Sequence, residues 1–169
     1  MHLDDNQSVI SGSFRTILLE PRGFFSWDYD LYQGHTYLSS ISVSLLKERG
    51  DFSISGENYS IYHENINGPF LLFRGPEIMA RAFKPNYFLN QFTLEHQGRS
   101  YSLKSLSSAT KTFYLMDGET AVATVRRRGV LSSGGEAVLA DHLSLPLGIF
   151  AIWLVIVMWK KDHETNAAD

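Results

Sequence analysis

The sequence predicts a mainly β protein, a closed antiparallel barrel of about twelve strands around a central hydrophobic C-terminal helix. Two observations lead to this prediction. Residues 12–141 consist of short segments in which apolar and polar side chains alternate, separated by tight turns. Residues 145–159, in contrast, are apolar on every face, so a helix formed by them must be hidden from water. A sheet that closes around this helix buries the apolar faces of both and leaves no exposed sheet edge.

The strands are predicted from their period of two residues and from the turns between them. The clearest hairpin turns at Gly98, which supplies a positive-φ residue, and a second hairpin turns at Asp117-Gly118. The predicted strands are 14–19, 27–31, 36–45, 52–54, 59–62, 70–73, 78–83, 91–95, 100–104, 112–116, 120–125 and 136–140. Residues 38–46 alternate less clearly and could form a short helix instead.

The helix is predicted over residues 145–160. Ser144 can cap its N-terminus, and Pro146 falls in the first turn, where the missing N–H has no partner to lose. Lys160 and Lys161 fall in the last turn, where the helix dipole favours cations.

The chain is predicted to form a single domain over residues 12–161. Residues 1–11 are polar and acidic and are expected to be a flexible N-terminus. Residues 162–169 have no apolar period and are expected to be a frayed polar tail.

The length of the apolar run separates a buried core helix from a membrane segment. Fifteen residues reach roughly 22 Å as a helix, which is short of the ~30 Å hydrocarbon core of a bilayer. Trp153 lies in the middle of the run, whereas interfacial tryptophans lie at its ends. A buried core helix is therefore favoured, and a tail anchor flanked by lysines is the alternative.

The composition excludes several classes of function. The chain has no cysteine, which excludes disulfides, cysteine-bound metals and thiol catalysis. The net charge of −3 gives no general attraction for nucleic acid, so no nucleic-acid partner is expected. The N-terminal residues lack the basic and apolar regions of a signal peptide, which predicts a cytoplasmic protein. We found no motif for a catalytic residue set, a metal or a cofactor, and the sequence predicts none of these.

The helix carries a resemblance to a known family. Its sequence follows the pattern Leu-Pro-Leu-x-x-Phe-x-x-Trp-Leu-Val from Leu145 and ends in basic residues, after a series of short hairpins. In this the chain resembles the tubby C-terminal-like superfamily, which includes the LURP-one-related proteins and the phospholipid scramblases. The resemblance covers about residues 14–161 and implies a twelve-stranded barrel threaded by the C-terminal helix. It implies little about activity, because a fold does not determine a function.

One basic cluster is a candidate anion site. Arg126 and Arg128 are expected on one face of a strand, with Arg127 on the other, and Lys104 and Lys111 are near in sequence. Guanidinium groups bind phosphate well, and tubby-like domains bind phosphoinositide headgroups through surface lysines and arginines. The alternative is a solvated cluster that protects a strand end.

These observations predict a non-enzymatic binding or scaffold module. Its ligand would be an anionic phospholipid headgroup or a protein partner on the outer barrel surface, with a location in the cytoplasm or at the periphery of a membrane. The alternative is a tail-anchored membrane protein with a cytoplasmic β domain and residues 145–159 as the membrane segment. If the helix fills the barrel, any ligand must bind outside it or at its rims.

Overall fold

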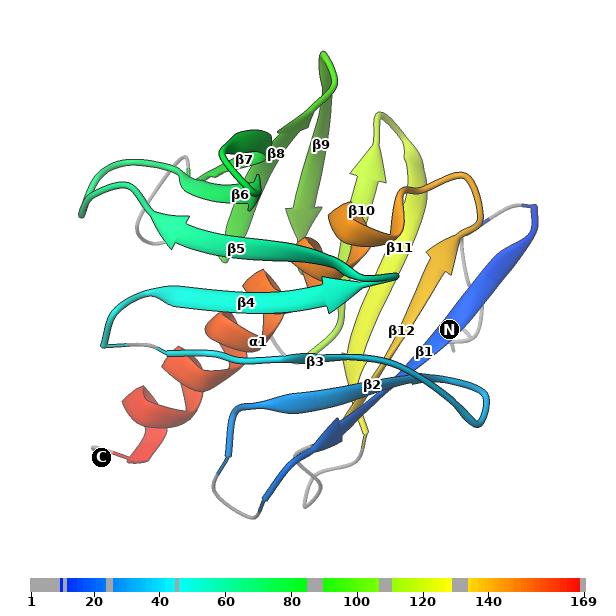
Figure 1. Cartoon of the computed structure of the whole chain (residues 1–169), viewed down its shortest axis with the longest axis horizontal. Coiled ribbons are helices and arrows are strands. Elements are labelled where there is room, and N and C mark those ends of the chain that lie inside the picture. Colours follow the sequence, from blue (N-terminus) through cyan, green and yellow to red (C-terminus); the bar gives the residue numbers. More distant parts are fainter. Residues whose placement is uncertain are drawn as a thin grey trace, which may run out of the picture.

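The computed structural model describes residues 10, 12–23, 26–44, 46–84, 90–106, 111–128 and 134–167. They form twelve strands and one helix (Figure 1). The elements are β1 (Phe14–Pro21), β2 (Tyr29–Gln33), β3 (Thr36–Ile41), β4 (Arg49–Ile54), β5 (Glu57–His63), β6 (Phe70–Arg74), β7 (Glu77–Phe83), β8 (Gln91–His96), β9 (Arg99–Lys104), β10 (Phe113–Asp117), β11 (Thr120–Arg127), β12 (Gly135–Ala140) and α1 (Leu145–Ala167). The mainly β prediction is confirmed, and each predicted strand overlaps an observed one.

The sheet is an antiparallel meander whose first and last strands also pair. Its order is β3-β2-β1-β12-β11-β10-β9-β8-β7-β6-β5-β4. Phe14 of β1 lies opposite Ala140 of β12, and Leu19 lies opposite Gly135. Because β1 and β12 pair, the two ends of this order are β3 and β4, which follow each other in the chain.

The barrel is nearly closed rather than closed, because β3 and β4 are the two ends of the strand order and are not paired with each other as strands. Ser42 N donates to Asp51 O at 3.3 Å, next to an isolated bridge between Ser44 and Arg49. Among the described residues, no hydrogen-bonded ladder joins the two named strands. We call this line between β3 and β4 the seam.

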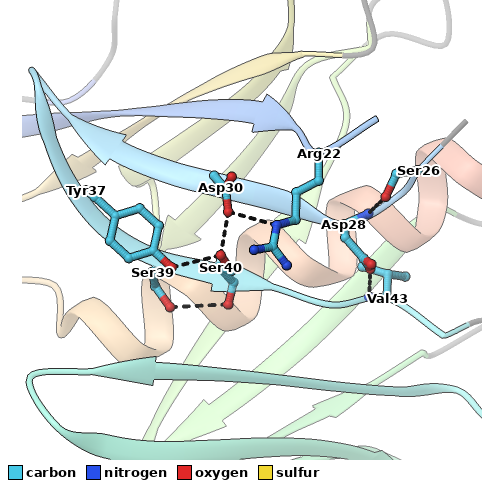
Figure 2. Close-up of polar contacts among 8 residues, drawn as sticks. All are labelled: Arg22, Ser26, Asp28, Asp30, Tyr37, Ser39, Ser40 and Val43. Atoms are coloured by element: carbon cyan, nitrogen blue, oxygen red, sulfur yellow. Dashed lines mark hydrogen bonds and ion pairs between the residues drawn. The ribbon is translucent and has the colours of Figure 1, made fainter. Parts of the chain in front are cut away.

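A side-chain network supports β3 beside the seam (Figure 2). Asp30 on β2 accepts from Arg22 Nε at 3.1 Å and from the hydroxyl of Ser40 on β3. The same hydroxyl lies 2.8 Å from the Tyr37 hydroxyl. On the seam side, Ser39 Oγ accepts from the Ser53 backbone N–H at 3.3 Å. Side chains therefore replace part of the missing ladder between β3 and β4.

The helix occupies the inside of the barrel (Figure 1). Every residue from Leu147 to Trp159 is buried, so no face of this stretch reaches water. Trp153 Nε1 donates to Ser42 O at 3.0 Å, and Trp159 Nε1 donates to Lys111 O at 3.1 Å. Ser42 follows β3 and Lys111 precedes β10, and these two strands are five positions apart in the sheet order. The helix thus fills the space that side-chain layers fill in an ordinary small barrel.

Close packing at the seam depends on Gly50. A Cβ atom at this position would lie 2.1 Å from Trp153 Nε1 and 2.8 Å from Ser42 O. Only a glycine lets the indole reach the seam and donate to its carbonyl.

The N-terminal cap of the helix is as predicted. Leu147 N donates to Ser144 Oγ at 3.3 Å, and Gly148 N donates to Ser144 O at 3.0 Å.

The observed C-terminal end of the helix differs from the prediction. The helix continues through polar residues to Ala167 instead of ending near residue 160. No glycine or proline follows Lys161 to end it. The ring of His163 in this extension lies 6.0 Å from that of Trp27.

One further residue and one other expectation need comment. Ile10, which precedes the predicted start of the domain, is buried in the core. The structure of residues 1–9, 11, 168 and 169 lies outside the described part of the chain. The alternative helix over residues 38–46 is wrong, because β3 continues to Ile41 and Ser44 forms a bridge. Within the described residues, no helix has both the length and the apolar character needed to cross a membrane.

Candidate functional site

All the cations predicted for the anion site lie at one end of the barrel. Lys104 ends β9, Arg126 and Arg128 lie at the end of β11, and Lys111 precedes β10. α1 leaves the barrel at this end, because its Trp159 reaches the Lys111 carbonyl. We call it the helix-exit end. The connections that follow β1, β3, β5, β7, β9 and β11 begin here, since neighbouring strands are antiparallel.

The arginines of the basic cluster are engaged in ion pairs. Arg126 Nη2 lies 2.9 Å from Glu136 Oε1, and Arg128 Nη1 lies 3.6 Å from Glu20 Oε1. Both arginine side chains remain more than half exposed. Among the described residues, Lys104 and Lys111 form no ion pair.

Arg127 faces inward, as the strand alternation predicts. Its guanidinium lies 5.8 Å from the centre of the Trp159 ring, and its Nε is buried with no hydrogen-bond partner among the described residues. Burial raises the pKa of the nearby Tyr29 phenol from 10.0 to about 12, although the positive charge of Arg127 opposes this rise. Arg127 and Tyr29 therefore belong to the packed end of the core rather than to a surface site.

Exposed apolar side chains gather at the helix-exit end. Leu46 is 102% exposed, Ile66 is 83% exposed and Leu106 is 65% exposed, the highest values among the large hydrophobic residues of the described part. They lie in the connections that follow β3, β5 and β9. Sequence reasoning missed them, because single apolar residues in turns have no periodic signal.

A pocket opens at the same end, between the helix and the strands that surround it. Its volume is about 490 Å³. Phe70 of β6, Phe92 of β8, and Val157 and Met158 of α1 form its apolar lining, and all four are buried. Ile66, in the β5–β6 connection, also lines it.

Charged groups border the pocket on one side. Lys161 Nζ lies 3.7 Å from Glu48 Oε1, and the other oxygen of this carboxylate contacts His63 Nδ1. His63 Nε2 lies 3.0 Å from the Gly68 carbonyl oxygen. Both ring nitrogens of His63 therefore lie within contact distance of an oxygen atom.

Lys84 is the second lysine of the pocket. Partial burial and the nearby ammonium of Lys161 lower its pKa, and the carboxylate of Asp162 opposes this effect. Within the described residues, Lys84 forms no ion pair, so two ammonium groups face the pocket and only that of Lys161 is paired with Glu48.

Neither a metal site nor a relative points to a chemical reaction. The described residues contain no group of three or more His, Asp or Glu side chains that could hold a metal ion. No family model, curated protein or solved structure matches this chain. The candidate functional site is therefore the helix-exit end itself.

Proposed function

We propose that this protein is a non-enzymatic binding module, of the tubby-like kind that its helix resembles, which docks its helix-exit end on membranes containing anionic phospholipids. The observation that carries the proposal is the position of Leu46, Ile66 and Leu106. The most exposed apolar side chains of the described part lie at the same end as Lys104 and Lys111. A barrel of twelve strands around a C-terminal helix also supports the kinship.

The arrangement suits a lipid surface better than a protein partner. The apolar residues lie singly in separate connections, whereas a stable protein interface needs about 800 Å² per partner with a contiguous apolar centre. Each Leu or Ile that leaves water contributes about 1.5–3 kcal/mol, and each lysine near an anionic surface contributes about 1 kcal/mol. A few such groups give reversible binding that weakens as salt screens the charges.

Vesicle sedimentation tests the apolar contribution. The wild-type protein should sediment with phosphatidylcholine vesicles that contain phosphatidylserine or a phosphoinositide, and not with phosphatidylcholine alone. The L46S/I66S variant should bind several-fold more weakly. The matched control is F14S/I78S, which removes exposed apolar side chains (51% and 38% exposed) at the opposite end and should bind as the wild type does.

The cations are tested in the same assay. K104Q/K111Q should weaken binding more than R126A/R128A, because both arginines are already paired with glutamates. Arg99→Gln, at the opposite end, is the control. If the wild-type protein stays in the supernatant with every vesicle, the proposal is wrong and a protein partner is favoured. Equal losses in the variants and their controls would also overturn it.

A further inference from the structure

The pocket beside α1 has the size of a ligand site. Its volume of about 490 Å³ lies within the range of roughly 300–1,000 Å³ found for small-molecule sites. Membrane docking does not require a pocket, because surface cations and exposed leucines suffice for it. The pocket therefore needs its own explanation.

The lining of the pocket is divided between apolar and charged groups. Phe70, Phe92 and Met158 supply a continuous apolar surface from two strands and the helix. Ile66, which also lines the pocket, is 83% exposed and would lose water contact if a hydrocarbon chain lay against it. This part of the pocket favours an unbranched apolar chain.

The charges favour an anion at the head of that chain. The titratable groups that face the pocket are Glu48, His63, Lys84 and Lys161, with Asp162 nearby. Glu48 already contacts His63 and Lys161, so little negative charge remains for Lys84. Partial burial is the main cause of the lowered pKa of Lys84, and repulsion by the Lys161 ammonium adds to it. An anionic group placed between the two ammonium groups would relieve this repulsion.

We propose that this pocket binds a single-chain amphiphile with an anionic headgroup, a carboxylate or a phosphate monoester. The chain lies against Phe70, Phe92 and Met158, and the headgroup lies between Lys84 and Lys161. This site goes beyond membrane docking, since a free amphiphile can reach it without a bilayer. The two proposals therefore fail separately.

Calorimetric titration of the full chain with monomeric amphiphiles tests the proposal. Dodecanoate and dodecyl phosphate are the two anionic probes, and they distinguish a carboxylate from a phosphate preference. Dodecanol is the neutral probe of the same chain length. We expect at least one anionic probe to bind at least ten-fold more tightly than dodecanol. Each methylene removed from its chain should weaken binding about four-fold, because the chain is buried.

Charge variants locate the headgroup. K84Q and K161Q should each weaken binding of the anionic probe by about ten-fold or more, since each removes a charged partner. Lys160→Gln is the matched control, because Lys160 is the neighbour of Lys161 on α1 but does not line this pocket. Equal affinity of both lysine variants and the wild type would overturn the proposal.

A spectroscopic readout locates the chain. The sequence has four methionines, and Met79 and Met116 lie on β7 and β10, outside the lining of the pocket. The methyl resonance of Met158, assigned with M158L, should shift on binding, while those of Met79 and Met116 should not. Failure of both anionic probes to bind at about 1 mM, or binding without a Met158 shift, would show that the pocket is not the site.

Discussion

Replacing Gly50 by alanine tests whether the seam is held by the buried Trp153. In the wild type the indole N–H donates to Ser42 O at 3.0 Å, and Gly50 lies next to the Nε1 edge of the indole. The new Cβ would lie 2.1 Å from Trp153 Nε1, 2.7 Å from Cε2 and 2.8 Å from the Ser42 carbonyl oxygen. The indole cannot move away freely, because it is 1% exposed and packs against Phe70 at a ring distance of 5.6 Å.

The expected loss of stability follows from three contributions. Overpacking in a dense core costs about 1–3 kcal/mol. Displacing the indole leaves its buried N–H without a partner, which costs about 1–3 kcal/mol more. Alanine also reduces the entropy of the unfolded chain, which offsets about 0.4–1 kcal/mol. The free energy of unfolding should therefore fall by about 1–5.6 kcal/mol, which lowers Tm by about 2–22 °C for a chain of this size.

Urea and thermal unfolding followed by circular dichroism measure this loss. The control is Gly23→Ala, where the nearest heavy atom to a new Cβ is Ser26 Cβ at 3.7 Å, and its change should stay within about 0.5 kcal/mol. In a W153F background the penalty of G50A should fall by at least about 1 kcal/mol, because the clashing Nε1 atom is gone. If G50A is as mild as G23A, or if its effect simply adds to that of W153F, the reasoning about the seam is refuted.

Three further changes have defined outcomes. The pKa of Tyr29 is about 12 in the folded protein and 10.0 when the chain is unfolded. The contribution of the protonated phenol to the free energy of unfolding is therefore complete below pH 10, and about 3 kcal/mol of it is lost as the pH rises toward 12. Tyr29→Phe should therefore lose less stability over this range in urea titrations at each pH, and identical profiles would contradict the assignment. Deleting residues 145–169 removes the buried side chains of α1. If each large one contributes about 1.5–3 kcal/mol, their burial stabilises the fold by about 16–33 kcal/mol. This exceeds the typical net stability of a domain, about 5–15 kcal/mol. The truncated chain should lack a cooperative unfolding transition, and a folded truncated barrel would show that the helix is not its core. Trp159→Phe removes the hydrogen bond to Lys111 O and should cost about 1–3 kcal/mol in the same urea assay, whereas an unchanged midpoint would mean that this bond contributes nothing net.

The strands and the core helix could be predicted because each depends on a local pattern. The alternation around Gly98 and Asp117-Gly118 is set by side chains that face the core or the solvent, and β8 to β11 follow it. The burial of residues Leu147 to Trp159 could likewise be predicted, because a helix that is apolar on every face must be shielded from water on every side.

The seam and the end of the helix could not be predicted in the same way. The packing at the seam depends on contacts between residues distant in the chain, such as Trp153 with Ser42 and Gly50. The helix passes Lys161 because polar residues without glycine or proline permit a helix as readily as a coil.

The candidate site was predictable only in part. The cations at Lys104, Lys111, Arg126 and Arg128 are visible in the sequence, and antiparallel pairing brings them to one end. The connections that follow odd-numbered strands all lie at this end, and Leu46, Ile66 and Leu106 are in three of them. The sequence did not indicate these residues, because a single apolar residue in a turn has no periodic signal. The pocket was not predictable, because its lining combines β6, β8, α1 and the β5–β6 connection, and its shape depends on how they pack.

The order of elements along the chain has a consequence for how the barrel is made. The helix that forms its core follows all twelve strands, and β1 can complete its pairing only after β12 has been synthesised. During synthesis the apolar faces of the strands therefore stay exposed to water until the helix has been made. Such exposed surface favours aggregation or binding by chaperones. The seam is the one break in the described sheet, and the helix could enter the barrel there after the strands have paired. The hydrogen bond from Trp153 Nε1 to Ser42 O then joins the helix to the seam. We therefore expect that this domain completes its folding only after α1, its last element, has been synthesised.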